Sequence, residues 1–318
     1  MAKEPVGTIR EKNRIVENIV RAMTEREEFL LCGHQNPDED CISSMVALAI
    51  LLSRFDKPAS IFLNSQIPAN VSYLLSICKY NGIRVLSAKS RLPSAVDTII
   101  VCDTPKRDML DVSRAVETAM KRKGVLVIEF DHHIGADSNY MGDEGYRLVT
   151  DASSTCELIG YLALKLRNMK GILSRFMIAD PFSRNFVLAI LTGIISDTNM
   201  GRFLKTKREK KYYAIFSSIY NEILAASTVR ENNITSGDEI YRELQRLSRR
   251  EEDCYQYIIG KRQLAGHIAY VVLTEDEMDA LYRDYDQETI NSVTKTAAND
   301  LAESTGKIGL VVFFDDKS

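Results

Sequence analysis

Histidines and aspartates stand at the ends of apolar runs along the first two thirds of this 318-residue sequence. Three of the four histidines take such positions: His34, His132 and His133. Five aspartates do the same: Asp38, Asp40, Asp103, Asp131 and Asp197. Imidazole and carboxylate donors suit a hard or borderline divalent ion such as Mn²⁺, Mg²⁺ or Fe²⁺, and they suit a cysteine-rich structural zinc site poorly.

These donors are too many for one ion. Five aspartates could not share a crevice as bare charges, because like charges at close range destabilise one another. A pair of divalent ions would neutralise them. Two metals about 3.5–4 Å apart can clamp a phosphoryl group, activate a bridging water and stabilise the leaving oxygen. The residue types therefore predict hydrolysis of a phosphate ester or anhydride.

Alternating strands and helices are expected to position these side chains. Apolar runs predict strands over residues 29–32, 59–63, 83–86, 98–102 and 125–130, and helical spacing predicts helices near 7–27, 42–52, 71–78 and 111–120. This alternation is typical of an α/β fold with a mostly parallel sheet flanked by helices. Side chains past the carboxyl ends of such strands converge on one crevice. A single aspartate there is often only a helix cap, but four converging segments favour a site.

A second, smaller α/β domain is expected after the first. Helical patterns continue over residues 156–166, 182–195 and 210–224, and a polar segment follows at 227–237. We therefore expect one domain over residues 1–230 and another over 231–318. The second would hold a linker helix (240–259) and strands at 267–273 and 307–314. His267 has no acidic neighbours in its strand, so we expect no site there.

Bulk composition narrows the class of protein. A formal net charge of −3 gives no overall attraction to nucleic acid or an anionic membrane. The six cysteines form no C-x-x-C pair, and several lie in apolar runs, which favours a reducing compartment. No apolar stretch is long enough to cross a bilayer, and the charged N-terminus has no secretory apolar core. We expect a cytoplasmic protein without a membrane partner.

Across residues 29–203, the chain resembles the DHH phosphoesterase family in four motifs that occur in order. The first is the H-x-x-P-D-x-D pattern at residues 34–40, and the second is Asp103 after its strand. The third is the run 131–133, Asp-His-His, and the fourth is residues 193–198, with Arg202 five positions beyond Asp197. A lone Asp-His-His would be a weak signal, whereas four motifs in order are specific.

The resemblance implies two bound Mn²⁺ ions, with Mg²⁺ or Fe²⁺ as alternatives. It assigns their ligands as His34 and Asp38 for one ion, Asp40, His132 and Asp197 for the other, and Asp103 as the bridge. It also gives His133 a contact with the phosphate, where it would polarise or protonate the leaving group. Asp131 would orient its neighbours from behind. Arg202 would clamp a phosphate or be a solvated surface arginine, at about even weight.

The chain departs from the family pattern in two places. Many members have glycine where this chain has Glu39 and Ser43, which bears on phosphate geometry and leaves the ligands unchanged. The second domain resembles only the opening half of the DHH-associated substrate domain, because the sequence lacks its Gly-rich G-G-G-H element. This half is expected to be truncated, degenerate or completed by a partner.

The expected substrates are short oligonucleotides or nucleotides such as 3′-phosphoadenosine 5′-phosphate. Residues 205–211 form a basic run that could follow a nucleotide backbone, although a solvated helix face is the favoured interpretation. Lys106 and Arg107 stand closer to the predicted site. The alternatives are a cyclic-dinucleotide phosphodiesterase, a pyrophosphatase-like hydrolase and a catalytically weak nucleotide sensor. The sequence leaves the oligomeric state open, a homodimer included.

Overall fold

The computed structural model describes residues 2–65, 67–226, 234, 236–244, 246–266, 268–305 and 308–313. The chain divides into two compact units, Met1–Leu244 and Gln245–Ser318. The boundary expected after residue 230 lies outside the described residues, and the division between the units comes after Leu244. Within the described ranges, no helix is both long and apolar enough to cross a bilayer.

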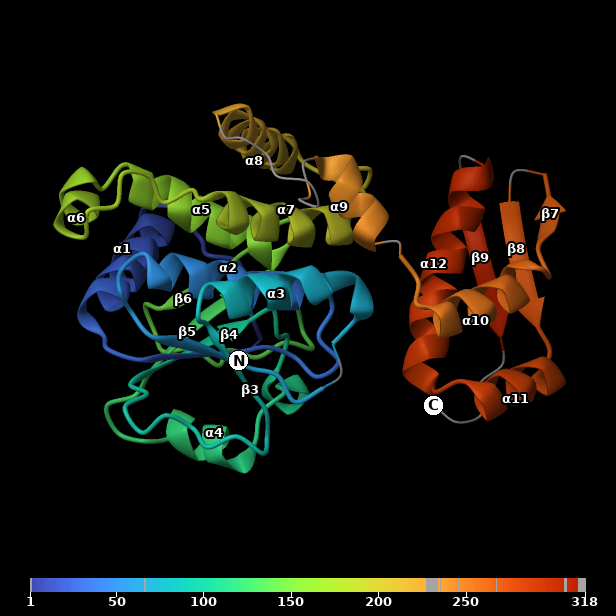
Figure 1. Ribbon diagram of the computed structural model, residues 1–318, viewed down its shortest axis with the longest axis horizontal. Helices are drawn as coiled ribbons and strands as arrows, with labels where there is room; N and C mark the ends of the chain where they lie inside the picture. Colours follow the sequence, from blue (N-terminus) through green and yellow to red (C-terminus); the bar gives the residue numbers. More distant parts are fainter. Residues whose placement is uncertain are drawn as a thin grey trace. The chain divides into compact units, whose positions relative to one another are not determined.

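The first unit is built on a six-stranded sheet in the order β3-β2-β1-β4-β5-β6, in which every pairing is parallel (Figure 1). Its strands are β1 (Phe29–Cys32), β2 (Ala59–Phe62), β3 (Arg84–Leu86), β4 (Thr98–Cys102), β5 (Leu126–Asp131) and β6 (Arg147–Val149). The predicted mostly parallel α/β fold is confirmed. Only β6 was not predicted, since it has three residues and no apolar run beyond Leu148 and Val149.

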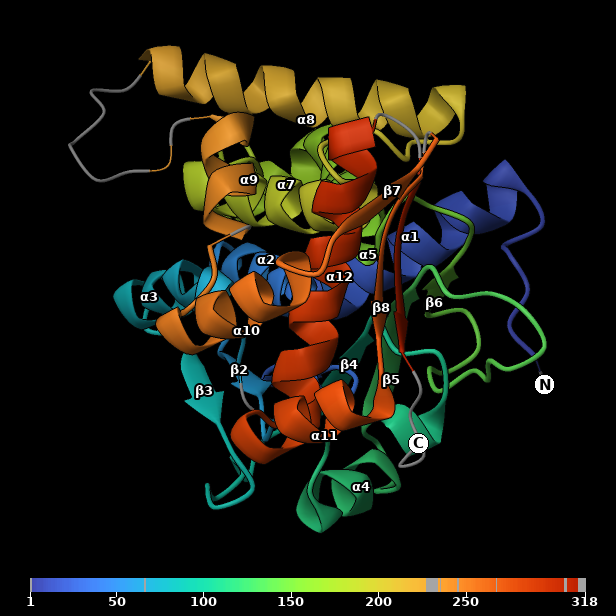
Figure 2. The same cartoon turned by 90° about the vertical axis from the view of Figure 1, so that its right-hand side faces the viewer.

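Helices cover both faces of this sheet. The described helices of this unit are α1 (Ile9–Glu25), α2 (Glu39–Ser53), α3 (Ser72–Tyr80), α4 (Arg114–Met120), α5 (Thr155–Arg167), α6 (Lys170–Arg175), α7 (Arg184–Thr198), α8 (Lys207–Ala226) and α9 (Gly237–Leu244), with short 3₁₀ turns η1 (Ala69–Val71) and η2 (Arg107–Met109). A large apolar core lies on the side of α1, α2, α5 and α7, and a smaller one lies under α4 (Figure 1). Helices α2 and α7 are apolar on nearly all sides: α2 packs between the sheet and α7, and α8 and α9 cover α7 in turn (Figure 2).

The order of the strands determines where a site can form. Strand β1 pairs with β2 on one side and with β4 on the other. From β1 the chain adds β2 and β3 in one direction across the sheet, and β4, β5 and β6 in the other, so the strand order reverses between β1 and β4. A crevice opens at the carboxyl ends of strands where such a reversal occurs. Residues directly after β1, β4 and β5 therefore share one edge of the sheet.

The second unit contains a three-stranded sheet of β7 (Gln263–Ala265), β8 (Ile268–Leu273) and β9 (Ile308–Phe313), with helices α10 (Arg249–Ile259), α11 (Glu275–Asp284) and α12 (Gln287–Thr305). Strands β8 and β9 are parallel, whereas β7 is antiparallel to β8. One face of this sheet packs on α10 and α12 around Ile258, Val271, Val293 and Leu301.

Three features of the second half differ from the prediction, one of them the short strand β7, which was not predicted. The single helix expected over residues 240–259 is wrong: α9 ends at Leu244 and α10 begins after Ser248. Ser248 and Glu251 form a reciprocal capping box, which starts a new helix and so interrupts the old one. Helix α12 was not predicted, although it is 19 residues long, because its polar and small residues hide the apolar spacing. His267 lies outside the described residues.

Candidate metal centre

Asp103 lies at the centre of the cluster that the sheet edge assembles. Its Oδ1 is 3.4 Å from His132 Nε2 and 3.6 Å from His133 Nδ1, and its Oδ2 is 3.7 Å from His34 Nε2. Its two carboxylate oxygens therefore face histidines from different strand ends. This arrangement is what a carboxylate shared by two ions would need.

The backbone of Asp103 is held in the left-handed region, at φ 50°. Few non-glycine residues adopt this conformation, and it persists only where neighbouring contacts impose it. Here the Asp103 N–H donates to the carbonyl of Phe130 on β5 at 2.8 Å. The Thr155 hydroxyl at the start of α5 donates to Asp103 Oδ1 at 2.9 Å. Both contacts keep the carboxylate aimed at the histidines.

His34 and Asp38 form one side of the cluster. His34 Nε2 lies 3.7 Å from Asp38 Oδ1, and the other ring nitrogen lies 2.7 Å from the carbonyl of Gln35. A backbone partner on one ring nitrogen directs the other toward a ligand position. Asp38 is the N-cap of α2, where its carboxylate accepts the N–H of Cys41 at 3.1 Å.

Asp40, His132 and Asp197 form the other side. One donor atom from each lies within 4.8 Å of the other two. His132 Nε2 is 3.6 Å from Asp197 Oδ2, and its Nδ1 is 3.2 Å from the carbonyl of Ala152. The structure thus brings together all six predicted ligands, from the ends of β1, β4 and β5 and from α2 and α7. Their role as ligands stays a prediction.

The N-terminus of α5 holds Asp40. The N–H of Thr155 donates to Asp40 Oδ2 at 2.7 Å, and the N–H of Cys156 donates to Oδ1 at 3.1 Å. The first N–H groups of a helix lack partners within the helix and favour an anion. Asp40 is fully buried, so these contacts fix a charge that has little access to water. The sequence showed no link between Asp40 and a residue 115 positions away.

Burial and neighbouring charges shift the pKa values of the acids and imidazoles in the cluster. Burial raises the pKa of Asp40 to about 7, and the neighbouring Asp103 adds to the effect. Burial and then Asp40 raise the pKa of Asp197 well above its usual range. Burial opposes a charged His34, but Asp38 and Asp103 outweigh it and raise the pKa to about 9. Divalent cations would replace these protons.

Cys41 also lies beside the cluster. Its Sγ falls within 4.8 Å of donor atoms of His34 and Asp103. Burial, followed by the charge of Asp103, raises the pKa of this thiol well above its ordinary value. A thiol that keeps its proton is a poor metal ligand, which favours the neighbouring oxygen and imidazole donors over Cys41.

Asp131 and His133 stand together next to this cluster. Asp131 Oδ1 accepts the backbone N–H of His133 at 3.1 Å and lies 2.8 Å from its ring Nδ1. Asp131 is buried, whereas the His133 side chain is 41% exposed, compared with 18% for His132. His133 is therefore the most accessible of the three rings, and Asp131 lies behind it. The other carboxylate oxygen of Asp131 meets Lys3, a residue that no sequence motif had singled out.

The residues that bear on phosphate binding follow or adjoin the cluster residues in the sequence. Arg202 is exposed in the turn after α7, beside Phe203, which is 59% exposed. Lys106, after Asp103, pairs with Asp137 at 3.0 Å. Glu39 accepts a hydrogen bond from Asn70 at 2.8 Å. The basic run 205–211 begins α8, where the side chain of Glu209 caps the first turn, which agrees with a helix face rather than a nucleotide track.

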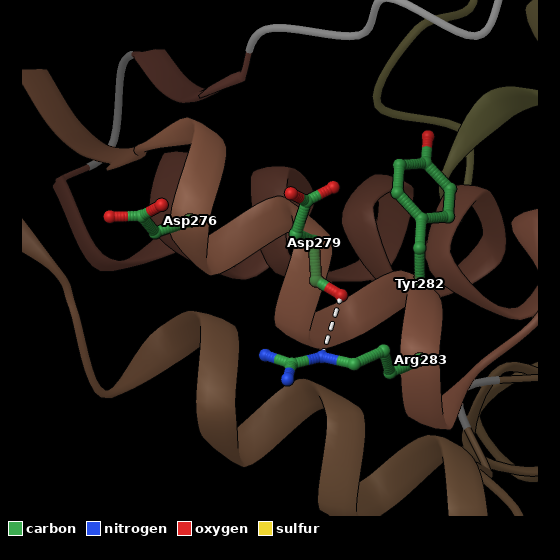
Figure 3. A pocket seen from close by; sticks show the side chains of 4 residues that line it. All are labelled: Asp276, Asp279, Tyr282 and Arg283. Carbon is green, nitrogen blue, oxygen red and sulfur yellow. Dashed lines mark hydrogen bonds between the residues drawn. The ribbon is translucent and has the colours of Figure 1, made fainter.

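A hollow of about 540 Å³ lies in the second unit and is lined by Asp276, Asp279, Tyr282 and Arg283 (Figure 3). All four residues belong to α11, and the Arg283 side chain donates to the carbonyl of Asp279 at 3.3 Å. Acidic groups outnumber the single arginine, so the hollow does not have the charge of a phosphate site. It contains none of the predicted site residues.

Comparisons with known proteins agree with the motifs. The family model described as "DHH family, N-terminal domain" matches residues 28–194, a range that includes all predicted ligands except Asp197. An exopolyphosphatase-related protein from Bacteroides fragilis has a similar solved structure: the identity is 17%, the TM-score is 0.58, and the match covers 89% of this chain and 75% of that one. At this identity the likeness shows the fold alone.

RecJ from Thermus thermophilus, solved in complex with Mn²⁺, matches at 14% identity with a TM-score of 0.42. That match covers 98% of this chain and 47% of RecJ, so this chain spans about half of RecJ's length. A comparison with curated protein sequences found no significant match. Since the family model covers more than half of the sequence, the chain belongs to the DHH family.

Proposed function

We propose that this protein is a two-metal phosphoesterase that hydrolyses phosphodiester or phosphomonoester bonds of nucleotides and short oligonucleotides. The observation that carries the proposal is the position of Asp103 between His34 and His132, with one carboxylate oxygen facing each. Two divalent ions joined by one carboxylate would have Asp38 on one side and Asp40 and Asp197 on the other. Such a pair holds a phosphoryl group and lowers the pKa of a bound water.

His133 is proposed to act on the leaving group. Its ring Nδ1 is engaged by Asp131, which leaves Nε2 for the substrate. A histidine held in this way can donate a proton to the departing oxygen as the ester bond breaks. Asp131 maintains the ring orientation. Burial opposes the charge of Asp131, but contacts with His133 and Lys3 lower its pKa below the usual range, so it serves as a constant anion.

Mn²⁺ is the proposed ion, because carboxylate and imidazole donors suit it and a solved RecJ structure carries it. Mg²⁺ and Fe²⁺ accept similar donors.

The six cysteines are all free and buried, which supports a reducing, cytoplasmic setting.

Nucleotides are preferred over inorganic substrates because of the turn after α7. Arg202 supplies a permanent charge with a planar hydrogen-bonding face, and the adjacent Phe203 presents an exposed ring. Stacking of a base on an aromatic ring contributes about 1–3 kcal/mol. Pyrophosphate has no base and would gain nothing from this ring.

The test is a hydrolysis panel with the purified chain and Mn²⁺. The substrates are pApA, 3′-phosphoadenosine 5′-phosphate, a cyclic dinucleotide and pyrophosphate, and products are separated by chromatography. We expect turnover of pApA or the bisphosphate that stops when EDTA removes the metal. Turnover of pyrophosphate or the cyclic dinucleotide alone would move the assignment to those hydrolases. Tight nucleotide binding without turnover would favour the sensor alternative.

A further inference from the structure

The start of the chain lies against the loop that follows His133. Lys3 and Gly135 form an antiparallel bridge, in which the Gly135 N–H donates to the Lys3 carbonyl at 3.2 Å. The Lys3 N–H donates to the Ser138 hydroxyl at 3.2 Å. Further along, the N–H of Val6 donates to the carbonyl of Val149 on β6 at 3.1 Å. We call residues 3–6 the N-terminal strap. Its contacts give Lys3 a defined place beside the site.

The side chain of Lys3 is completely buried. Its exposed fraction is 0%, and Nζ lies 2.8 Å from Glu129 Oε1, 2.5 Å from Asp131 Oδ2 and 2.6 Å from the carbonyl oxygen of Thr104. The ammonium group donates hydrogen bonds to Asp131 Oδ2 and to the Thr104 carbonyl, and Glu129 Oε1 adds an ionic contact. A lysine is almost never fully buried without such partners.

The acceptors of Lys3 belong to the two segments that carry the site. Thr104 directly follows Asp103 after β4, and Asp131 ends β5 directly before His132. Lys3 therefore joins the carboxyl ends of two neighbouring strands. The second oxygen of Asp131 accepts the N–H of His133 and contacts its ring. A single carboxylate thus connects the ammonium of Lys3 to the imidazole of His133.

We propose that Lys3 is a positioning residue for the hydrolytic reaction. It fixes Asp131 in one orientation, and Asp131 in turn fixes the ring of His133 toward the substrate. The N-terminal strap is therefore part of the active site, although it precedes the matched family region. This inference rests on the proposed function, since it gives His133 a role in turnover.

A purely structural role would make different predictions. If Lys3 only neutralised two buried carboxylates, its loss would lower stability and leave the kinetics of the folded protein unchanged. A positioning role predicts a fall in kcat with little change in KM, because His133 acts on the leaving group after the substrate is bound. It also predicts a changed environment for the ring nitrogens of His133.

The experiment compares Lys3→Met and Lys3→Arg with wild type under Mn²⁺, on whichever substrate wild type hydrolyses. We expect K3M to lower kcat about ten- to hundredfold, the usual effect of losing an outer-shell partner, with KM and Mn²⁺ affinity within about threefold. K3R retains a cation and should recover part of kcat.

The matched control is Lys57→Met. Lys57 is also largely buried, at 12% exposure, and pairs with Glu27 at 3.5 Å, before the amino ends of β1 and β2. K57M should keep wild-type kcat.

A nuclear magnetic resonance measurement separates this inference from the proposed function. With diamagnetic Mg²⁺ in place of Mn²⁺, the ring ¹⁵N shifts of His133 report its hydrogen bond to Asp131 without any turnover. We expect K3M to change these shifts and K57M to leave them alone. If wild type hydrolyses nothing on the panel, the proposed function fails, while the shifts still test Lys3.

Two results would overturn the proposal. One is a folded K3M protein with kcat within twofold of wild type and unchanged His133 shifts, and the other is an equal loss of kcat in K57M. K3M leaves the buried carboxylates of Glu129 and Asp131 without their cation. Where K3M does not fold, Lys3→Met combined with Glu129→Gln removes one of these two charges. The amide oxygen introduced by E129Q can still accept the N–H groups of Met141 and Gly142, which Glu129 accepts at 3.0 and 2.9 Å. The same criteria then apply to that variant against Glu129→Gln alone.

Discussion

Gly193 of α7 faces Asp40 of α2 with no space between them for a side chain. A Cβ on Gly193 would lie 2.3 Å from Asp40 Oδ1 and 2.5 Å from the Sγ of Cys156. Real Cβ atoms essentially never make contacts under 3.0 Å. The glycine of the fourth motif therefore serves packing: it lets two buried helices approach so closely that Asp40 fits between α7 and the start of α5.

Gly193→Ala should damage the metal centre and the fold together. The added methyl must displace Asp40 or separate α2 from α7, and overpacking of this kind costs about 1–3 kcal/mol. We expect a lower free energy of unfolding in urea and weaker Mn²⁺ binding by calorimetry. Gly171→Ala on α6 is the control, since a Cβ at this position would have open space for 4 Å around it and alanine there should stabilise by about 0.4–1 kcal/mol. Wild-type Mn²⁺ affinity in G193A would contradict this account.

Asp103→Asn should abolish turnover. The amide keeps the shape but removes the charge that two ions would share, and metal stabilisation of the transition state amounts to several kcal/mol. We expect kcat to fall at least about a thousandfold, which corresponds to about 4 kcal/mol, together with weaker Mn²⁺ binding. Asp97→Asn, just before the other end of β4, is the matched control because the Asp97 side chain accepts hydrogen bonds from Glu27 and Thr98 there. Should D103N hydrolyse the substrate at a comparable rate, Asp103 is not a bridging ligand.

Stability of the metal-free protein should fall as the pH rises. The pKa of Asp40 is about 7 in the folded protein against 3.8 for the free group, and that of His34 is about 9 against 6.5. Both folded pKa values are raised. For each group, the folded protein therefore binds more protons than the unfolded chain at a pH between the unfolded and the folded pKa. Their stabilising contribution is complete below the unfolded pKa and is lost as the pH passes the folded pKa. With EDTA present, the Tm should decrease from about pH 5 to about pH 9.

The same protons compete with metal, so the effect of Mn²⁺ on Tm should have the opposite trend. Ligands bind metal in their deprotonated form, and more of them are deprotonated at about pH 8 than at about pH 6. Differential scanning fluorimetry with Mn²⁺ and with EDTA at both values measures the difference. A larger Mn²⁺ effect at the lower pH would show that Asp40 and His34 are not the groups that bind the ion.

Arg202→Ala should weaken substrate binding without affecting the metal. Loss of a charge-assisted hydrogen bond costs about 1.5–3 kcal/mol, so KM should rise about tenfold or more while Mn²⁺ affinity stays constant. Arg175→Ala, at the end of α6, should leave KM unchanged. An unchanged KM in R202A would identify Arg202 as an ordinary surface arginine.

Phe203→Ala should discriminate between substrates. Stacking on the exposed ring would favour a nucleotide by about 1–3 kcal/mol, so KM for pApA should rise at least about fivefold. The KM for a small phosphodiester without a base or any other aromatic ring, such as dimethyl phosphate, should not change. Tyr80→Ala provides the control, since Tyr80 is an exposed aromatic residue of α3, at 87%. Equal effects on both substrates would remove the argument for base recognition.

Local patterns in the sequence were enough to predict the sheet and the meeting place of its acids. The strand Thr98–Cys102 was predicted with the bounds that the structure has, because a buried parallel strand is a continuous apolar run between polar residues. Since the carboxyl ends of parallel strands meet, Asp103 and His132 could be placed together without knowledge of any contact. The division of the expected helix 240–259 could not be predicted as readily, because the capping box at Ser248 competes with an otherwise helical pattern.

Contacts between distant residues determine how the cluster is held. Thr155 bonds Asp40 across 115 positions, and Lys3 bonds Asp131 across 128. Neither contact can be predicted from residue spacing or hydrophobic periodicity, because packing in three dimensions determines which side chains meet. The types of donor and the edge on which they gather follow from the order of residues along the chain. The support behind Asp131 and the absence of space at Gly193 arise only when α2, α5, α7 and the N-terminal strap pack around them.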